Sequence, residues 1–332
     1  MRKFFLNSLF YSVAGMLLLS SCNLTSTKKT DSQKNVILKV GICADVHRDF
    51  FPDNELFLQT FIDNMNDRGD IDFIIQLGDF SSPYDYNLPF LEIWNKFKGP
   101  AYHVIGNHET DYGFTNDDAV AFLGAKGAYY SFDTKGYHFV VLSGNDINPG
   151  KPVVPYDYHS YIGEEQRRWL ADDLDKTDLP VIAFCHQSID PNLESIEYFS
   201  SIEQAADTRS ILEHANDKAG FRKVRLILSG HHHTDFHSFV NDIHYVSINS
   251  MSVIWLGYDL LGECYSEEIL EKYPIARHMI PYKDPLWAVM TIYADGEIAI
   301  EGRQTEFRGV PLAERGIESP WFVPSISDRL LK

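Results

Sequence analysis

Five short polar clusters in this sequence carry side chains that bind metal ions, and each follows a run of apolar residues. They are Asp45-Val46-His47, Gly78-Asp79, Gly106-Asn107-His108-Glu109, the lone His186 and Gly230-His231-His232-His233. Imidazole nitrogens combined with carboxylate oxygens suit Mn, Fe, Zn or Co better than Ca or Mg. Taken singly, a histidine at the end of a strand is more often structural, and Gly-Asp or Gly-Asn more often forms a turn. Five such clusters in succession indicate a metal site.

The spacing inside two of the clusters supports the same interpretation. Side chains two residues apart on an extended chain point to the same side, so Asp45 and His47 can face one site. The same holds for His231 and His233, whereas His232 between them points away. We therefore expect His232 to lie outside the metal site, either facing solvent or hydrogen-bonded to a neighbour.

The apolar runs ahead of the clusters predict the strands that position them. Their Val, Ile, Leu and Phe content is typical of strands buried on both faces. With their polar ends, these segments cover residues 36–47, 71–80, 101–109, 179–187 and 224–233. Amphipathic helical patterns lie between them, for example over residues 54–67 and 163–176. Strands that alternate with helices predict an α/β layered fold, in which functional groups gather beyond the carboxyl ends of the strands.

Two other segments, residues 137–144 and 243–250, have the composition of strands but lack a ligand cluster. Near the C-terminus, residues 286–303 predict a β-hairpin that turns at Asp295-Gly296. The sequence contains no evident repeat or interdomain linker, so a single catalytic domain is the simplest organisation.

The ordered clusters resemble the signature of the calcineurin-like metallophosphoesterases, which runs D-x-H, G-D, G-N-H-[DE], a lone H and G-H-x-H. This sequence contains the whole signature in order, over roughly residues 36–250. The segment YIGEEQRRWLADDL also resembles a helix that recurs in the family. The resemblance implies a four-layer α/β/β/α sandwich, in which two packed mixed β-sheets are flanked by helices and a two-metal centre lies between them.

The resemblance also implies a role for each site residue. One metal ion would be held by Asp45, His47, Asp79 and His233. The second would be held by Asp79, Asn107, His186 and His231, so that Asp79 bridges the pair. His108 would not bind metal but would contact the phosphoryl or leaving-group oxygen, as a general acid or a charge stabiliser, the alternative being a structural histidine. Glu109 is interpreted as orienting either His108 or a metal ligand.

Such a centre predicts hydrolysis of phosphate mono- or diesters by direct attack of a metal-bridging hydroxide, without a phosphoenzyme. Two divalent cations outweigh the charges of Asp45 and Asp79, so the centre attracts phosphate although the chain has a formal net charge of −18. The motifs do not separate monoesterases from diesterases. The alternative is a non-catalytic lipoprotein that binds metal or a phosphoryl ligand on the same fold, but the signature lacks neither a ligand nor His108. The acidic chain, with no evident basic face, argues against a nucleic-acid partner.

The N-terminal sequence MRKFFLNSLFYSVAGMLLLSSC has the layout of a secretory signal peptide over residues 1–21. A transmembrane anchor is the alternative, but Asn7, Ser8 and Ser12 interrupt an apolar stretch of marginal length. The ending LSSC resembles a bacterial lipobox, which implies cleavage before Cys22 and lipid attachment to that cysteine. We therefore expect a lipoprotein anchored in the bacterial cell envelope, on the periplasmic side or at the cell surface.

The remaining organisation follows from these features. Residues 22–35 form a polar tether, residues 36–310 the metallophosphoesterase domain and residues 311–332 a C-terminal tail. Beyond Cys22 the chain has three cysteines, Cys43, Cys185 and Cys264, and an odd number rules out a fully paired disulfide framework. Pairing of Cys43 with Cys185 stays open at this point, as does the oligomeric state.

Overall fold

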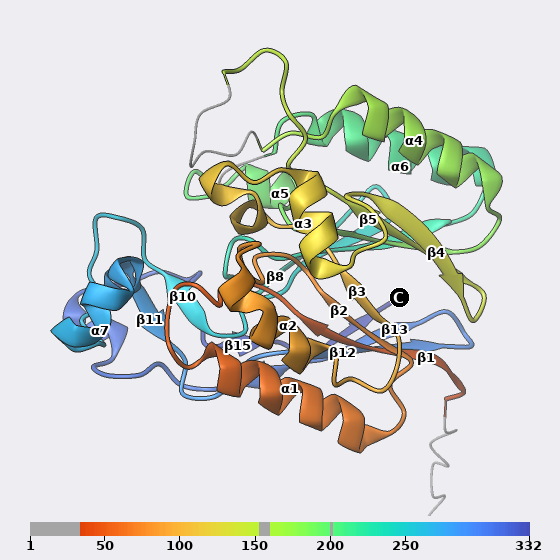
Figure 1. Cartoon of the computed structure of the whole chain (residues 1–332). Coiled ribbons are helices and arrows are strands. Elements are labelled where there is room, and N and C mark those ends of the chain that lie inside the picture. Colours follow the sequence, from red (N-terminus) through yellow and green to blue (C-terminus); the bar gives the residue numbers. More distant parts are fainter. Residues whose placement is uncertain (1–33, 153–159, 200–201) are drawn as a thin grey trace, which may run out of the picture. The chain divides into compact units, whose positions relative to one another are not determined.

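Two six-stranded sheets form the centre of the part of the chain that the computed structural model describes, residues 34–152, 160–199 and 202–332 (Figure 1). The first sheet has the order β16 (Arg329–Leu331), β13 (Ile298–Glu301), β12 (Ala288–Tyr293), β1 (Val36–Cys43), β2 (Phe73–Gln76) and β3 (Ala101–His103). The second has the order β4 (Tyr130–Thr134), β5 (Tyr137–Leu142), β6 (Val181–Cys185), β7 (Val224–Ser229), β9 (Ile243–Ser247) and β8 (Phe236–Val240). The predicted signal peptide, Cys22 and the tether as far as residue 33 lie outside the described residues.

Both sheets are mixed, with parallel strands at the positions that carry the ligand clusters. In the first sheet, β1, β2 and β3 run parallel, while β12, β13 and β16 add antiparallel pairs. In the second sheet, β5, β6, β7 and β9 run parallel between the antiparallel edge strands β4 and β8. The carboxyl ends of parallel strands meet at one edge of a sheet, so the clusters that follow β1, β2 and β3 start out as neighbours.

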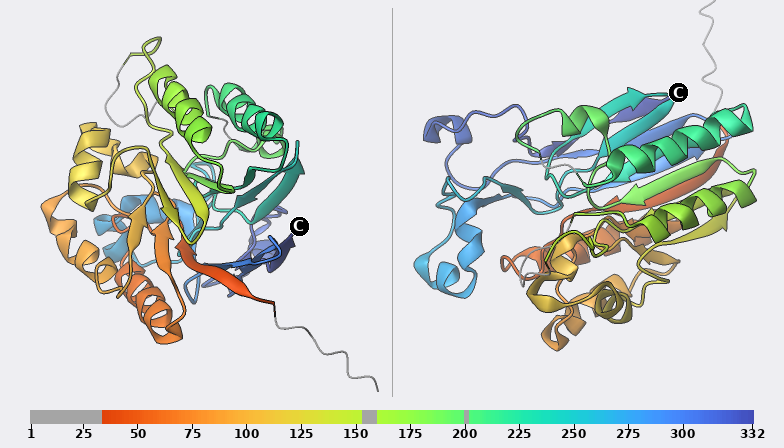
Figure 2. Two further views of the ribbon diagram at one scale, coloured as in Figure 1. Left: turned by 90° about the vertical axis from the view of Figure 1, so that its right-hand side faces the viewer. Right: turned by 90° about the horizontal axis from the view of Figure 1, so that it is seen from above.

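The helices cover the two outer faces, which confirms the predicted four-layer sandwich (Figure 2). The helices are α1 (Asn54–Arg68), α2 (Leu88–Trp94), α3 (Asn116–Leu123), α4 (Glu164–Lys176), α5 (Pro191–Glu194), α6 (Ala205–Ala219) and α7 (Glu267–Lys272). Apolar residues of α1, α2 and α3 pack with the outer face of the first sheet, and those of α4 and α6 with that of the second. Side chains from the facing surfaces of both sheets form one core between them.

The predicted local structure matches the observed elements closely. The pattern over 54–67 is α1, which ends at Gly69 in the left-handed conformation (φ 68°), as is common after a helix C-terminus. The predicted hairpin is β12 and β13, with Gly296 in its turn at φ 86°. Because Phe57, Phe61 and Met65 recur on one side of α1 and are buried, the helix packs by its apolar face.

Shorter elements complete the described chain. They are the strands β10 (Val253–Trp255), β11 (Met279–Pro281), β14 (Arg303–Gln304) and β15 (Ser325–Ile326), and the 3-10 helices η1 (Asp85–Asn87), η2 (Asn107–Glu109), η3 (Asp111–Gly113), η4 (Pro274–His278) and η5 (Leu312–Arg315). Residues 311–332, treated above as a tail, contribute β15 and β16 to sheets and bury Phe322, Ile326 and Leu331 in the core. Within the described residues, no helix combines the length and apolarity needed to cross a bilayer.

A buried histidine on β5 of the second sheet should make the stability of the protein depend on pH. His138 on β5 is hydrogen-bonded through Nδ1 to Asp133 (2.6 Å) and through Nε2 to Asp173 on α4 (2.8 Å). Burial opposes the charged ring, but the bonds to Asp173 and Asp133 outweigh it and raise the pKa of His138 above its usual 6.5. The stabilisation is therefore fully present below pH 6.5 and is lost as the pH rises through the raised pKa.

We expect His138→Gln to lower the free energy of unfolding by about 1.5–3 kcal/mol at pH 6, the range for hydrogen bonds to charged groups. The deficit should shrink at pH 9, where the wild-type ring is closer to neutral. Urea unfolding of both proteins at the two pH values measures it. A deficit that is equal at pH 6 and pH 9 would mean that the ring contributes by packing rather than by charge.

Candidate metal centre

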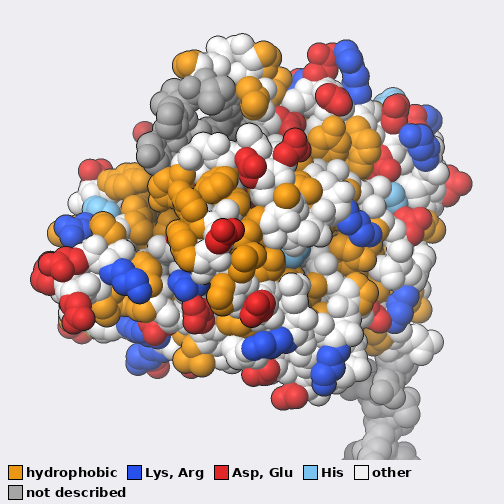
Figure 3. All heavy atoms as spheres, in the orientation of Figure 1, with side chains coloured by type: hydrophobic (Ala, Val, Ile, Leu, Met, Phe, Trp, Pro, Cys, Tyr) orange, Lys and Arg blue, Asp and Glu red, His pale blue; other side chains and the backbone are white. Residues whose placement is uncertain are grey.

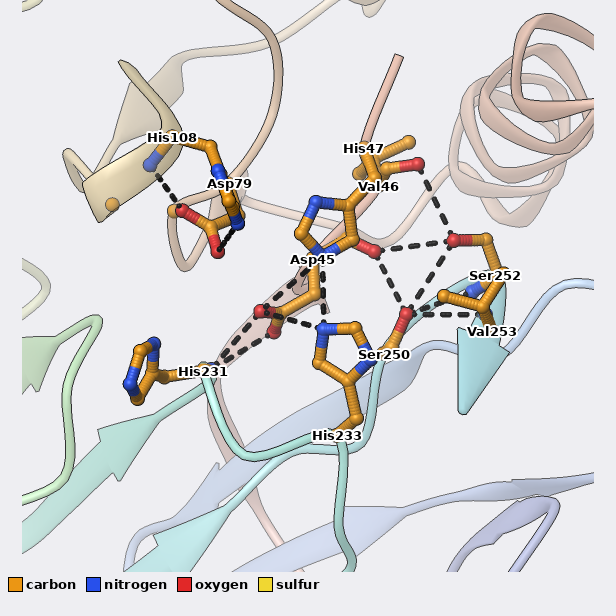
Figure 4. Close-up of polar contacts among 12 residues, drawn as sticks. Asp45, Val46, His47, Asp79, His108, His231, His233, Ser250, Ser252 and Val253 are labelled. Atoms are coloured by element: carbon orange, nitrogen blue, oxygen red, sulfur yellow. Dashed lines mark hydrogen bonds and ion pairs between the residues drawn. The ribbon is translucent and has the colours of Figure 1, made fainter. Parts of the chain in front are cut away.

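The structure brings together every residue that the sequence analysis assigns to the metal centre, from five loops that each follow a strand. Asp45 and His47 follow β1, Asp79 follows β2, and Asn107 and His108 lie on η2 after β3. From the second sheet, His186 follows β6, and His231 and His233 follow β7. Figure 4 shows side chains from both sheets pointing toward one another across the space between them.

The potential ligand atoms fall into overlapping groups whose members lie within 4.8 Å of one another. The groups are Asp45, His47 and His233; Asp79, His186 and His231; and His47, Asp79 and His108. In the first, His233 Nε2 lies 2.8 Å from His47 Nε2 and 3.4 Å from Asp45 Oδ1. In the second, His186 Nε2 lies 3.1 Å from Asp79 Oδ2 and 3.3 Å from His231 Nδ1. The carboxylate of Asp79 therefore lies between the two halves of the cluster.

The backbone at the site is held in an uncommon conformation. The left-handed region, which residues with a Cβ seldom adopt, contains five site residues: Asp45 (φ 52°), His47 (φ 54°), Asp79 (φ 53°), His231 (φ 70°) and His233 (φ 47°). Such conformations cost free energy and are concentrated at functional sites. Here they turn both side chains of each His-x-His or Asp-x-His pair inward from a single tight loop.

Contacts around these loops keep the strained conformations in place. The Asp45 and His47 amides donate to the carbonyls of Gly78 (3.0 Å) and Asp79 (2.9 Å). The hydroxyls of Ser250 and Ser252 donate to the Asp45 carbonyl at 2.8 and 3.2 Å (Figure 4). These bonds fix the backbone of the first loop from two directions.

Two glycines of the motifs are required by close approach. A Cβ at Gly78, whose φ is 99°, would lie 2.4 Å from His186 Nδ1. A Cβ at Gly106 would lie 2.3 Å from the backbone nitrogen of Asp79. Gly78 therefore lets the loop after β2 approach His186 of the second sheet, and Gly106 lets the loop after β3 approach the Asp79 backbone within the first sheet.

Two polar atoms of the site, Asn107 Oδ1 and His186 Nε2, are placed as metal ligands would be. Asn107 is buried, and its Oδ1 has no hydrogen-bond partner among the described residues. His186 donates from Nδ1 to the Leu77 carbonyl at 2.7 Å, so in the neutral ring Nε2 turns a lone pair toward the Asp79 carboxylate. Facing acceptors at these distances need a positive charge between them, either a proton or a metal ion.

The pKa of His186 shows the same demand for positive charge, whereas that of His47 shifts in the opposite direction. Burial opposes a charge on His186, but the Asp79 carboxylate outweighs it and raises the pKa of His186 to about 9. Burial and the neighbouring His233 lower the pKa of His47 well below its usual value, so that this ring is neutral and can offer a lone pair. The donor set of neutral imidazoles, carboxylates and an amide oxygen matches Mn, Fe, Zn or Co.

Comparison with known proteins agrees with this geometry. The family model for calcineurin-like phosphoesterases matches residues 38–235, more than half of the chain. The chain belongs to the calcineurin-like phosphoesterase family. This confirms the resemblance noted in the sequence.

Individual relatives carry phosphatase names. The manganese-dependent ADP-ribose/CDP-alcohol diphosphatase of Arabidopsis thaliana is 27% identical over 232 residues, 55% of this chain and 72% of that protein. The protein of the same name from Oryza sativa subsp. japonica is 24% identical over 303 residues, 72% of this chain and 92% of that protein. A solved dimetal phosphatase from Danio rerio has the same fold, with a TM-score of 0.54 at 15% identity over 83% of this chain and 100% of that chain. This phosphoesterase is thus a metal-dependent hydrolase that uses two metal ions.

His108 is placed differently from the other histidines of the phosphoesterase site. Its side chain is 31% exposed, whereas that of His186 is fully buried. Its Nε2 lies 3.8 Å from Asp79 Oδ2, and its Nδ1 is hydrogen-bonded to Asp111. Burial opposes a charge on the ring, but Asp79 and Asp111 outweigh it and raise the pKa of His108 to about 9. His108 can therefore carry a proton at neutral pH in a position that is open to a substrate.

Asp111 is a functional residue that the sequence analysis missed. It lies on η3, three residues after His108, and its carboxylate contacts the ring nitrogen that faces away from Asp79. The spacing His-x-x-Asp is the signal that could have identified it, because a helical turn brings residues three apart together. Asp111 orients the imidazole and favours its protonated form.

Glu109 is hydrogen-bonded to the backbone of two loops of the phosphoesterase site and does not orient His108. The carboxylate is fully buried and accepts hydrogen bonds from four backbone amides, those of Asp79 (3.0 Å), Phe80, Ser81 (3.0 Å) and Gly106 (2.6 Å). It thereby joins the loop after β2 to the loop after β3. Glu109 was expected to orient either His108 or a metal ligand. The structure favours the second alternative, because Glu109 holds the backbone of Asp79.

We expect Glu109→Gln to destabilise the protein by about 2–4 kcal/mol, because the new amide group would face backbone donors and leave them unpaired. Metal content should fall with it, since the Asp79 loop loses its anchor. Denaturant unfolding and elemental analysis of the purified protein measure the two effects. The matched control is Glu301→Gln, since the Glu301 side chain is 60% exposed and pairs with Arg68 at the surface, where such a pair contributes about 0–1 kcal/mol. Equal small effects of the two substitutions would contradict the anchoring role.

His232, the middle histidine of the triplet, lies outside the groups of potential ligands. Its ring packs against Phe199 (centroid distance 4.8 Å) and His231 (4.9 Å) and is half-buried. Burial lowers the pKa of His232 to about 3. A neutral, packed ring of this kind supports the loop that carries His231 and His233.

Proposed function

We propose that the two metal ions are held as the family resemblance implies. Asp45, His47 and His233 bind one ion, Asn107, His186 and His231 bind the other, and Asp79 binds both. The observation that carries this assignment is the position of the Asp79 carboxylate, 3.1 Å from His186 Nε2 and in a common group with His47 and His108. When bound, such ions lower the pKa of a water molecule and neutralise charge on phosphate oxygens.

We further propose that His108 is the catalytic acid. The partly open imidazolium lies beside Asp79 and can donate a proton from Nε2 to the oxygen of the departing group. Asp111 holds Nδ1 and keeps the ring turned so that Nε2 faces the site. The leaving oxygen therefore departs as a neutral hydroxyl or a protonated phosphate rather than as a full anion.

For the substrate, we propose phosphoanhydride bonds of nucleoside diphosphate compounds, with manganese as the metal. The support comes from the two plant relatives, which are named for ADP-ribose and CDP-alcohols and for manganese dependence. The predicted mono- and diesters stay in the substrate range, because one dinuclear centre can bind a phosphoryl group with either substituent.

A panel of phosphate compounds tests this proposal. The full-length protein loaded with Mn²⁺ would be given ADP-ribose, a CDP-alcohol, p-nitrophenyl phosphate and bis(p-nitrophenyl) phosphate, each with and without a chelator. We expect chelator-sensitive cleavage of the two anhydrides, with nucleoside monophosphate as a product. Cleavage restricted to the p-nitrophenyl esters would contradict the anhydride assignment. Stable binding of two metal ions without turnover of any compound would favour the non-catalytic alternative.

We also propose that the phosphoesterase acts outside the cytoplasm as a lipoprotein anchored through Cys22. The support is the N-terminal sequence, with its basic start, apolar stretch and LSSC ending. Mass spectrometry of the membrane-associated protein should find a lipid-modified N-terminal cysteine, and Cys22→Ser should release the protein from the membrane fraction. An unmodified Cys22 in a protein that still begins at Met1 would refute the assignment.

A further inference from the structure

A group of aromatic rings lies on the two segments that follow Asp79 and His108 in the sequence, and belongs to neither the metal centre nor the core. We call it the aromatic rim, and it consists of Tyr84, Tyr86, Tyr112 and Phe114. Tyr84 is stacked on Tyr86 at a centroid distance of 5.1 Å with 13° between the planes. The Tyr84 ring also lies 6.1 Å from that of Tyr112 and 4.9 Å from that of Phe114, the latter edge to face. Rings from two separate loops thus meet at one place.

Both loops begin close in the sequence to residues of the site. Tyr84 lies five residues after Asp79, in the segment that leads into η1, and Tyr112 follows Asp111, the partner of His108. The Ser82 hydroxyl donates to the His108 carbonyl at 3.3 Å and joins the two segments at their base. Both segments of the aromatic rim are therefore connected to the metal centre by short stretches of backbone.

Two of the four rings are exposed to solvent, and the backbone of one of them is strained. Tyr86 is 61% exposed and Tyr112 is 49% exposed. Tyr112 also has a φ of 63°, an unfavourable conformation for a residue with a large side chain. Figure 3 shows hydrophobic side chains gathered on this face, over the start of α2 and the segment before α3. Exposed, strained aromatic residues beside a site are the expected form of a surface that binds part of a ligand.

The aromatic rim is a fixed surface, because its first loop is tied down from behind. The carboxylate of Asp49 accepts hydrogen bonds from the Ser82 amide (2.8 Å) and from the Asn87 side-chain amide (2.8 Å). The Asn87 side chain also donates to the Ser82 carbonyl at 2.9 Å. These bonds brace the loop on both sides of Tyr84 and Tyr86, so little order needs to be gained when a ligand binds.

The carboxylates near the aromatic rim restrict the charge of the group that can bind there. In the sequence Asp85 lies between Tyr84 and Tyr86, and the Asp49 and Asp111 carboxylates accept hydrogen bonds from the Ser82 amide and His108 Nδ1, respectively. Carboxylates so placed disfavour an anionic substituent, while ring faces favour a flat, uncharged one. A nucleobase meets both requirements, whereas a second phosphate or a sugar acid does not.

We propose that the aromatic rim binds the nucleobase of the substrate while the phosphate occupies the metal centre. This deepens the proposed function, on which it rests for the identity of the substrate. Base stacking on aromatic side chains is sequence-tolerant, so the rim would accept adenine and cytosine alike.

The test measures binding and does not need turnover. Titration calorimetry of the Mn²⁺-loaded full-length protein would compare AMP with ribose 5-phosphate, which has the same phosphate and sugar but no base. We expect AMP to bind about 5- to 150-fold more tightly, the range for stacking of one base. Equal affinities of the wild-type protein for the two compounds, or no binding of either, would overturn the proposal.

Substitutions in the aromatic rim test whether the preference for AMP over ribose 5-phosphate arises there. In the double variant Tyr84→Leu and Tyr86→Leu, which keeps apolar bulk but removes two ring faces, the affinity ratio should fall toward one. Tyr258→Leu is the matched control, because Tyr258 is 74% exposed and packs with Trp255 outside the rim. A thermal melt and metal analysis confirm that each variant is folded and loaded. An affinity ratio of AMP to ribose 5-phosphate that is unchanged in the double variant would show that the base binds elsewhere.

In one further outcome, the wild-type protein prefers AMP and the double variant loses that preference, but the wild-type protein does not cleave ADP-ribose. That outcome would contradict the proposed reaction but support the role of the aromatic rim.

Discussion

Asp79→Asn is expected to reduce turnover by about a thousandfold or more and to leave the protein with less than two bound metal ions. Asp79 is the carboxylate that lies between the two histidine groups, 3.1 Å from His186 Nε2 and 3.8 Å from His108 Nε2. An asparagine removes the negative charge while keeping the shape, so it weakens binding on both sides. A loss of several kcal/mol of charge stabilisation in the transition state corresponds to a factor of this size.

Metal content by elemental analysis and turnover on the best substrate of the panel measure the effect. The matched control is His232→Asn, because His232 neighbours two assigned ligands but lies outside the ligand groups. The control should keep two metal ions and turnover within a few fold of the wild-type protein. An Asp79→Asn variant with both ions and full turnover would show that the bridging assignment is wrong.

His108→Ala is expected to lower kcat by about 10²–10⁴-fold, the usual contribution of a positioned acid, without loss of metal. The loss should depend on the leaving group. p-Nitrophenolate departs without help from a proton, so the variant should lose much less activity on its esters than on substrates with alkyl or phosphate leaving groups. An equal loss on all leaving groups would contradict the acid role and favour a structural one.

Asp111→Asn should shift the pH profile in a defined direction. The pKa of His108 is raised to about 9 by Asp79 and Asp111 against the effect of burial. Removal of the Asp111 charge lowers that pKa, so the protonated ring is lost at a lower pH. The alkaline limb of kcat/KM should therefore move to lower pH, while the profile of a p-nitrophenyl ester should change little. An unchanged alkaline limb would assign it to another group.

The sequence by itself determined the parts of this protein that depend on neighbours along the chain. Apolar runs specified the strands β1, β2, β3, β6 and β7, because burial on both faces leaves a continuous hydrophobic pattern. The spacing of Asp45 and His47, and of His231 and His233, predicted that each pair faces one site, although left-handed backbone rather than an extended chain turns them inward. The turn at Gly296 followed from the left-handed conformation that glycine adopts most readily.

Tertiary structure alone decided how those parts meet. The amide of His231 donates to the carboxylate of Asp45 across a separation of 186 residues, and no local pattern encodes such a contact. The anchoring of the Asp79 loop by Glu109 likewise depends on how closely the loops after β2 and β3 approach. The same is true of residues 311–332, whose short apolar stretches are stable only because β16 pairs with β13. Local periodicity is a property of adjacent residues, whereas the sharing of Asp79 between two groups of ligands arises only when two sheets pack face to face.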